Sequence, residues 1–303
     1  MSSKAELHCL FCKGECRFVY KMDSYRIYKC LSCGTGQVFP MPDSSTLKEF
    51  YDGFLFSADP ANRRNVFLSA KRLFPLAGLL PDKNFKMLDV GGGGGFYSAA
   101  FEELGYGKAT YVDLDIQACK FAGELGLKNV LHGDVTKLGY GDKKFDFIMC
   151  RHLIEHLIDP VSFIQKTLGL LTEKGLFLLI CPNGNSLEYF AYPGLNLGKR
   201  IDCICRSNSS SKYNVIFKML AGNMLHGIDP PRHLWAITAE AVRSLFDKTC
   251  YNVCLGTYPL SDREFSPYYQ PRLFADKIYS FLGKYFTSKL HGGTHLAAII
   301  RRS

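Results

Sequence analysis

The feature that most constrains this chain is a run of five glycines, Gly91–Gly95, directly after a short apolar segment. Lys86–Val90 has the length and composition of a buried strand in a parallel sheet. Phe96–Leu104 is typical of a helix, and Gly105 is suited to end it. A loop without Cβ atoms between a strand and a helix lets a ligand lie against the backbone. The run therefore predicts an α/β fold with a ligand site at this loop.

The segments that follow continue the alternation of strand and helix. Asp159 and Pro160 have the residue types of an N-cap and a first helical position, so a helix is expected to begin there. Further strands are expected at residues 109–112, 129–132, 145–150 and 176–180, and a further helix at 116–125. This order predicts a doubly wound parallel sheet that binds ligands at the carboxyl ends of its strands.

The glycine run does not match the dinucleotide fingerprint G-x-G-x-x-G/A. If the fingerprint starts at Gly91 or Gly92, its final Gly/Ala position is occupied by Phe96 or Tyr97. An earlier start would place Val90 at the first glycine position. Asp89 stands directly before the loop, where a carboxylate suits a ligand with an ammonium group better than a pyrophosphate. The loop therefore favours a nucleotide-like ligand other than a dinucleotide.

These segments resemble the class I S-adenosylmethionine-dependent methyltransferases. Leu88–Gly95 is similar to the first motif of that family, Gly133–Val135 to its adenine motif, and His152–Pro160 to its fourth-strand segment. The resemblance implies S-adenosylmethionine as cofactor and a Rossmann-like sheet of seven strands. It also implies that the last strand, at residues 295–300, runs antiparallel to its neighbours.

The same resemblance implies a set of cofactor-binding residues. These residues are Asp89, Gly91, Gly93, Gly95, Asp113, Leu114, Asp134 and Val135. In the family, the acid at the position of Asp113 holds both ribose hydroxyls, and the acid at the position of Asp134 meets the adenine amine. Capping of the strand ends is the alternative for these two acids.

Two C-x-x-C pairs near the N-terminus predict a small zinc ribbon, because each pair directs two thiolates at one tetrahedral ion. The expected ligands are Cys9, Cys12, Cys30 and Cys33. Arg17–Tyr20 and Tyr25–Tyr28, between the pairs, predict a hairpin. Four thiolates leave no open position, so the predicted zinc is structural. Cys16 and His8 are alternative ligands, and unligated cysteines are the remaining possibility.

Two histidines are candidates for the proton acceptor that methyl transfer to a hydroxyl requires. His152 follows the fourth expected strand of the core. His233 reaches the same side if its segment folds over the mouth of the site. That segment, Arg232–Thr238, and the cysteine pairs resemble one bacterial-type branch of the family. A purely structural role is the alternative for His152.

A second possibility arises at His152-x-x-Glu155-His156. This segment resembles the E-x-x-E-H segment that binds a divalent cation in quinone-biosynthesis O-methyltransferases, with histidine at the first position. A structural turn and helix start is the alternative for Glu155 and His156.

Residues 184–231 are too long for an ordinary loop and predict a lid or cap over the substrate. Its aromatic residues suit an apolar or ring-shaped acceptor, or else they pack the insertion onto the core. These residues are Tyr189, Phe190, Tyr192, Tyr213 and Phe217. Cys203 and Cys205 have no matching pair for a metal site. Residues 272–290 are basic and apolar, which indicates core packing or contact with a membrane surface.

We therefore expect four parts: a ribbon at 1–40, a methyltransferase core at 41–183, an insertion at 184–231, and the rest of the core at 232–303. The net charge of +9 lies mostly after residue 184, where it suits nucleic acid, anionic lipid or an acidic substrate. Neither a signal peptide nor a membrane span is apparent, and twelve cysteines suit a reducing, cytoplasmic location.

The sequence favours methyl transfer to a small-molecule, saccharide or lipid-like acceptor at a hydroxyl. An RNA or protein methyltransferase that uses the ribbon and the basic C-terminal region is the first alternative. A non-catalytic, cofactor-binding regulatory module is the second.

Overall fold

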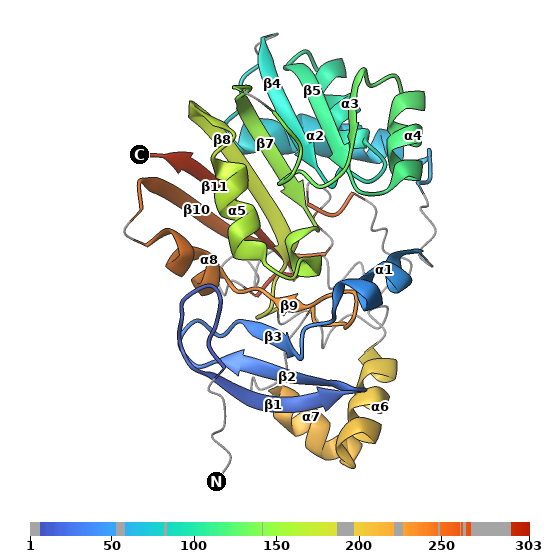
Figure 1. Ribbon diagram of the computed structural model, residues 1–303, viewed down its shortest axis with the longest axis vertical. Helices are drawn as coiled ribbons and strands as arrows, with labels where there is room; N and C mark the ends of the chain where they lie inside the picture. Colours follow the sequence, from blue (N-terminus) through green and yellow to red (C-terminus); the bar gives the residue numbers. More distant parts are fainter. Residues whose placement is uncertain are drawn as a thin grey trace.

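The computed structural model contains two sheets (Figure 1). It describes residues 7–52, 58–81, 84–140, 142–186, 197–220, 227–247, 249–260, 262, 265–267 and 292–303. The larger sheet has seven strands and the smaller has four. None of the helices in these ranges is both long enough and apolar enough to cross a bilayer.

The larger sheet has the strand order β10-β11-β8-β7-β4-β5-β6. Its strands are β4 (Phe85–Val90), β5 (Gly107–Asp113), β6 (Asn129–His132), β7 (Phe145–Arg151), β8 (Leu171–Pro182), β10 (Tyr251–Tyr258) and β11 (His295–Arg302). The neighbours from β6 to β8 pair in parallel, whereas β11 is antiparallel to both β8 and β10. The predicted seven-stranded sheet with an antiparallel last strand is therefore confirmed.

Apolar helices cover both faces of this sheet. On one face α2 and α3 enclose Phe147 and Met149 of β7, and on the other α5 and α8 enclose Ile148. The helices are α1 (Ser44–Asp52), α2 (Asn62–Leu76), α3 (Phe96–Glu103), α4 (Ile116–Glu124), α5 (Pro160–Leu168) and α8 (Ala239–Phe246), with a 3-10 turn, η1, at Ile154–His156. Because both faces are covered, the central strands β4, β7 and β8 contain buried apolar runs, which the sequence revealed, whereas the edge strand β10 is only half-buried and was not predicted.

Helix α5 begins with the predicted N-cap, Asp159. The Asp159 carboxylate accepts a hydrogen bond of 2.9 Å from the Ser162 amide, and Pro160 occupies the first turn. This cap fixes the point where the chain leaves η1, so the cap also positions the residues between β7 and α5.

The smaller sheet contains the predicted ribbon hairpin and two strands that were not expected. β1 (Cys16–Met22) and β2 (Tyr25–Cys30) form the hairpin, which turns at Asp23 with a left-handed φ of 51°. β3 (Gly36–Phe39) adds to β2, and β9 (Trp235–Ala236) adds to β3. The segment that carries His233 thus completes the ribbon sheet.

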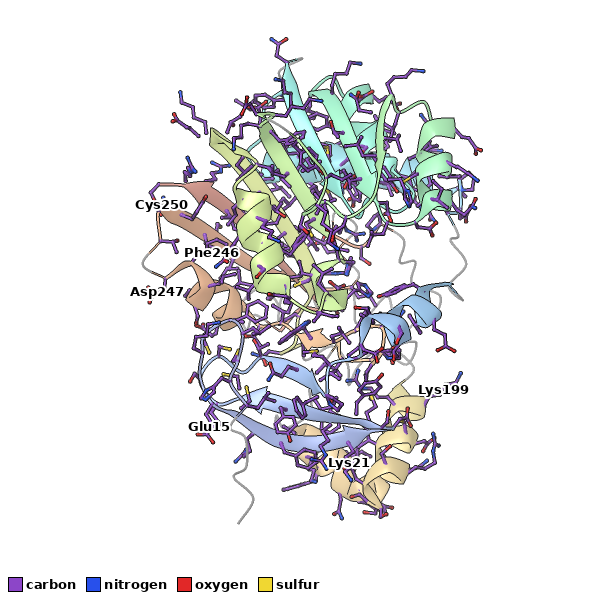
Figure 2. The ribbon with its side chains drawn as sticks, in the orientation of Figure 1. Glu15, Lys21, Lys199, Phe246, Asp247 and Cys250 are labelled. Atoms are coloured by element: carbon purple, nitrogen blue, oxygen red, sulfur yellow. The ribbon has the colours of Figure 1, made fainter. Side chains whose placement is uncertain are left out.

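The described helices of the insertion, α6 (Leu197–Asn208) and α7 (Lys212–Leu220), lie beside the ribbon (Figure 1). The Asn208 amide pairs with the backbone of Lys21 on β1, at 2.9 and 2.8 Å. Figure 2 shows Lys21 and Lys199 of α6 at the same end of the molecule. Helix α6 therefore docks on the ribbon, and the role of the insertion as a substrate cap stays a prediction.

The structure shows where two of the aromatic side chains of the insertion lie. Tyr213 is 86% exposed and Phe217 is 72% exposed, so the idea that they pack onto the core is wrong. Tyr189, Phe190 and Tyr192, like residues 272–290, lie outside the described part of the chain. Cys203 and Cys205 are half-buried and pack against a hydrophobic cluster that includes Tyr20 and Met22 of β1.

Candidate active site

The glycine loop lies at the carboxyl end of β4. Gly91, Gly93 and Gly95 have left-handed φ values of 65°, 53° and 67°, which L side chains rarely adopt. A Cβ added at Gly93 would meet nothing within 4 Å, so there is open space over the loop. Gly95 begins α3. The loop therefore presents bare backbone to a ligand, as the sequence predicted.

Asp113, the last residue of β5, faces this loop. Its Oδ2 accepts hydrogen bonds from the Gly93 amide at 3.1 Å and the Tyr111 hydroxyl at 3.3 Å. Its Oδ1 accepts from the Asp115 amide at 2.9 Å. Burial raises the pKa of the Asp113 carboxyl, against these hydrogen bonds. A carboxylate at the edge of the open space can accept from hydroxyls of a bound ligand.

Asp89 is buried below the loop, with 3% of its surface exposed. Its Oδ2 accepts a hydrogen bond of 2.7 Å from the Ser98 hydroxyl. Burial raises the pKa of Asp89 to about 6, and the nearby Asp113 adds to this, while Ser98 and Arg151 oppose it. A cation that binds beside Asp89 would therefore compete with a proton.

This competition predicts a pH dependence of cofactor binding. At pH 5 the affinity for S-adenosylmethionine should be about tenfold lower than at pH 7, because only about a tenth of Asp89 is ionised one unit below its pKa. Affinity should rise with pH, because the ionised carboxylate of Asp89 is expected to attract the ammonium group of the cofactor. Calorimetry between pH 5 and 8 would measure the change, and Asp89→Asn should remove most of it. An equal pH dependence in that variant would contradict the assignment, since only Asp113 would remain to cause it.

Asp134 has the contacts of a turn cap. Its Oδ1 accepts from the Thr136 amide at 2.9 Å and from the Thr136 hydroxyl at 2.8 Å, and Lys137 Nζ lies 3.3 Å from Oδ2. Burial opposes ionisation, but Thr136 and Lys137 outweigh it and lower the pKa of Asp134. Val135 is buried, and Leu114 is 65% exposed at the end of β5. The assignment of these three residues to the adenine stays a prediction.

His152 directly follows β7, which is the neighbour of β4, and has a left-handed φ of 51°. Its amide donates to the Ile180 carbonyl at 2.8 Å, which ties the turn to β8. Its Nδ1 lies 3.3 Å from Glu155 Oε1, and its ring centroid lies 5.2 Å from that of His295. The ring is therefore held at the carboxyl edge of the sheet, on the strand next to β4, and its Nε2 takes no part in the contact to Glu155.

Burial controls the charge of this pair. Burial lowers the pKa of His152, which favours a neutral ring. Burial alone would raise the pKa of Glu155, but the hydrogen bond from His152 and the nearby histidines outweigh it. Glu155 is therefore an ionised carboxylate, 1% exposed, that can accept the Nδ1 proton of His152.

Glu155, His156 and His233 form a second cluster, with possible ligand atoms all within 4.8 Å of one another. Nδ1 of His156 lies 2.9 Å from the Arg232 carbonyl oxygen, and Nδ1 of His233 lies 2.8 Å from the Gly227 carbonyl oxygen. A carbonyl can only accept, so Nε2 of His233 keeps its lone pair. Nδ1 of His156 also lies 3.0 Å from the Tyr51 hydroxyl.

The cluster fits a divalent cation. Burial and the neighbouring His156 lower the pKa of His233 to about 4, so this ring is neutral at pH 7. Glu155 Oε2 is buried, and the described part of the chain offers it no hydrogen-bond partner. Two imidazoles next to backbone carbonyls, with one carboxylate, are a common donor set for Zn²⁺. The sequence suggested His152 for this set, but in the structure His233 takes that place.

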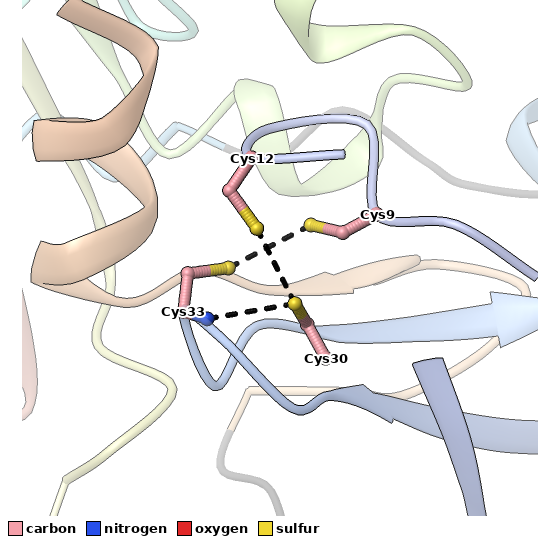
Figure 3. A group of neighbouring side chains, drawn as sticks. All are labelled: Cys9, Cys12, Cys30 and Cys33. Carbon is pink, nitrogen blue, oxygen red and sulfur yellow. Dashed lines mark hydrogen bonds between the residues drawn. The ribbon is translucent and has the colours of Figure 1, made fainter. Parts of the chain in front are cut away.

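The four predicted ribbon cysteines come together between the two knuckles (Figure 3). The Sγ atoms of Cys9 and Cys33 are 3.6 Å apart, and those of Cys12 and Cys30 are 3.4 Å apart. Four sulfurs at about 2.3 Å from one ion are about 3.8 Å from each other, so the thiols fit a tetrahedral zinc. The group contains neither Cys16 nor His8. A hydrogen bond with Cys16 helps raise the pKa of Cys9 to about 12, so the Cys9 thiol is protonated without a cation.

Two neighbours of the site were missed by sequence reasoning. The Arg151 guanidinium donates to the Phe265 carbonyl at 2.5 Å, lies 5.5 Å from the ring centroid of Tyr97 and lowers the pKa of Asp89. His295, at the start of β11, is 4% exposed beside His152. Arg151 could have been identified from the sequence, because it is a basic residue at the carboxyl end of a predicted strand. No feature of the sequence around His295 indicates that it lies beside His152.

Comparison with known proteins matches residues 88–179 to a family described as a methyltransferase domain. A ubiquinone biosynthesis O-methyltransferase of Haemophilus ducreyi is 31% identical over 114 residues, covering 34% of this chain and 48% of the relative. An uncharacterized methyltransferase of Bacillus subtilis is 32% identical over 102 residues, covering 31% and 40%. The chain thus spans about half the length, or less, of these relatives.

Solved structures of similar proteins include methyltransferases. A plantazolicin methyltransferase in complex with SAH is 14% identical with a TM-score of 0.45, over 88% of this chain and 92% of that chain. A possible histamine N-methyltransferase of Thermotoga maritima is 14% identical with a TM-score of 0.47, over 86% and 97%. Residues 88–179 therefore match a methyltransferase domain, and they lie on a seven-stranded sheet of the kind predicted from the resemblance to class I S-adenosylmethionine-dependent methyltransferases.

Proposed function

We propose that the chain transfers a methyl group from S-adenosylmethionine to a hydroxyl of a small-molecule, saccharide or lipid-like acceptor. One observation carries the proposal: the carboxyl edge of the sheet carries both the open glycine loop with Asp113 and a histidine of lowered pKa, His152, which is held by the buried carboxylate of Glu155. The relatives named as O-methyltransferases of ubiquinone biosynthesis support a hydroxyl acceptor.

The cofactor supplies an activated methyl group on a sulfonium, so the protein mainly has to position the acceptor oxygen. Asp113 would hold the ribose hydroxyls, and Asp89 the ammonium group. Glu155 can accept a hydrogen bond from Nδ1–H of His152, which would leave Nε2 free to take the proton that the acceptor hydroxyl loses when the methyl–oxygen bond forms and the methyl–sulfur bond breaks, with S-adenosylhomocysteine as the leaving group. The lowered pKa of His152 keeps the ring able to accept this proton at neutral pH.

Calorimetry with S-adenosylmethionine, followed by transfer assays with a labelled methyl group, would test the function. A panel of catechols, monosaccharides and prenylated phenols covers the acceptor classes. Saturable cofactor binding and label in at least one hydroxyl compound are expected. Absence of cofactor binding by the wild-type protein would remove the proposal, whereas label found only in RNA or protein would replace the acceptor class.

We also propose that the four-cysteine cluster holds a structural zinc ion. Protein purified without chelator should contain about one zinc per chain at this site. Cys30→Ser should lose most of it and unfold more readily, because a sheet this small depends on metal for folding energy. Metal analysis and thermal melts would measure both effects. Cys250→Ser is the matched control, since Cys250 is exposed beside β10 (Figure 2). Zinc retained by the Cys30 variant and lost by the control would contradict the assignment.

A further inference from the structure

The knuckle side of the ribbon shares its hydrophobic core with the methyltransferase sheet. Cys9, Phe11 and Cys33 belong to the same buried cluster as Ile148 of β7 and Leu179 of β8. A ribbon so short cannot bury a core of its own. The four-cysteine site is therefore built onto the face of the sheet that also carries α5 and α8.

Thr238 connects the second knuckle to the segment that follows His233. It is fully buried, and its hydroxyl donates to the Cys33 carbonyl at 2.6 Å. The same hydroxyl lies 3.4 Å from the Thr35 hydroxyl and accepts from the Ala241 amide at 3.1 Å, where it caps α8. One side chain thus ties the cysteine knuckle, β9 and α8 together.

Trp235 and Leu234 connect the same segment to η1. The Trp235 indole donates to the Leu157 carbonyl at 2.7 Å, and its ring packs edge-on against Phe11, at 5.8 Å between centroids. The Leu234 amide donates to the Glu155 carbonyl at 2.7 Å. Every link from the knuckle to the turn that carries Glu155 is therefore a direct contact.

We infer that Thr238 and Trp235 are positioning residues, through which the metal occupancy of the four-cysteine site sets the placement of Glu155 and His233. The inference rests on the proposed function, in which Glu155 and His233 lie on the side of the site that receives the methyl acceptor. The carboxylates of Asp89 and Asp113, on the cofactor side, take part in none of these hydrogen bonds, although β4 and β5 pack in the same buried cluster. Loss of zinc should therefore impair use of the acceptor and spare cofactor binding.

The full chain contains a single tryptophan, so Trp235 reports on this connection directly. In Thr238→Val, zinc content and cofactor affinity should stay within about twofold of wild type, while Trp235 emission shifts to longer wavelength. The KM for the acceptor found above should rise about tenfold with a smaller change in kcat, as expected when one buried hydrogen bond is lost. Thr238→Ser, which keeps the hydroxyl, should restore both, and Thr249→Val is a surface-side control.

Cys30→Ser extends the test to the metal itself and should shift Trp235 emission in the same direction with cofactor affinity retained. Unchanged Trp235 emission in both variants would overturn the inference, and so would a parallel loss of cofactor binding, which indicates general unfolding. If wild-type protein transfers no methyl group at all, the proposed function fails, but the fluorescence and cofactor-binding results still decide whether the ribbon is coupled to η1.

Discussion

Asp113→Ala is expected to weaken S-adenosylmethionine binding by more than about 100-fold, because a carboxylate that accepts from two ribose hydroxyls contributes about 1.5 to 3 kcal/mol through each bond. Asp113 is suited to this, since both of its oxygens point to the glycine loop and the turn beside it. Calorimetry at pH 7 would measure the loss without knowledge of the acceptor.

Asp115→Ala is a matched control, two residues further along the same loop. The Asp115 carboxylate caps α4 through the Gln117 amide at 2.7 Å. Its loss should cost about 1 kcal/mol of folding stability and leave cofactor affinity within about twofold. Unchanged affinity in the Asp113 variant, or an equal loss in both variants, would show that the ribose assignment is wrong.

His152→Ala is expected to lower kcat by about 100- to 10,000-fold, the usual contribution of a general base. Cofactor affinity should change little, because His152 contacts β8, Glu155 and His295 rather than the glycine loop. Glu155→Gln should give an intermediate loss, since the ring stays in place but the imidazolium is no longer stabilised. Single-turnover rates with a labelled methyl group would measure these effects, with exposed His8→Ala as the control.

The pH profile gives an independent test of the same role. A base works in its neutral form, and the pKa of His152 is lowered from its usual value of 6.5 by burial. The rate should therefore rise with pH and level off below pH 6.5. A plateau reached only above pH 7 would contradict a buried His152 as the base.

Another outcome would assign the chemistry to the metal cluster. If His233→Ala and His156→Ala lower kcat as much as His152→Ala does, and added divalent cation changes the wild-type rate, then Glu155 serves as a metal ligand. The acceptor oxygen would then be activated at the ion rather than by His152.

The strands, helices and cofactor side of this protein were predictable because the signals are local. The central strands contain buried apolar runs, and Asp89 and Asp113 lie at the carboxyl ends of β4 and β5, which are parallel neighbours in the sheet. The left-handed backbone of the loop could be predicted because the loop consists of glycines, which adopt positive φ readily. Strand β9 was not predictable, because a pair of residues, Trp235 and Ala236, has no periodicity to detect.

The sequence alone therefore determined the sheet, the cofactor loop and the proximity of the four cysteines, since adjacent residues and short hairpins place all of these. Only the tertiary structure brought together the proposed acceptor-side residues. His152 and Glu155 follow β7, His233 precedes β9, and His295 begins β11, and no spacing relates these segments. They meet because β11 inserts beside β8 and β9 joins the ribbon, and such pairings depend on shared burial between distant parts of the chain.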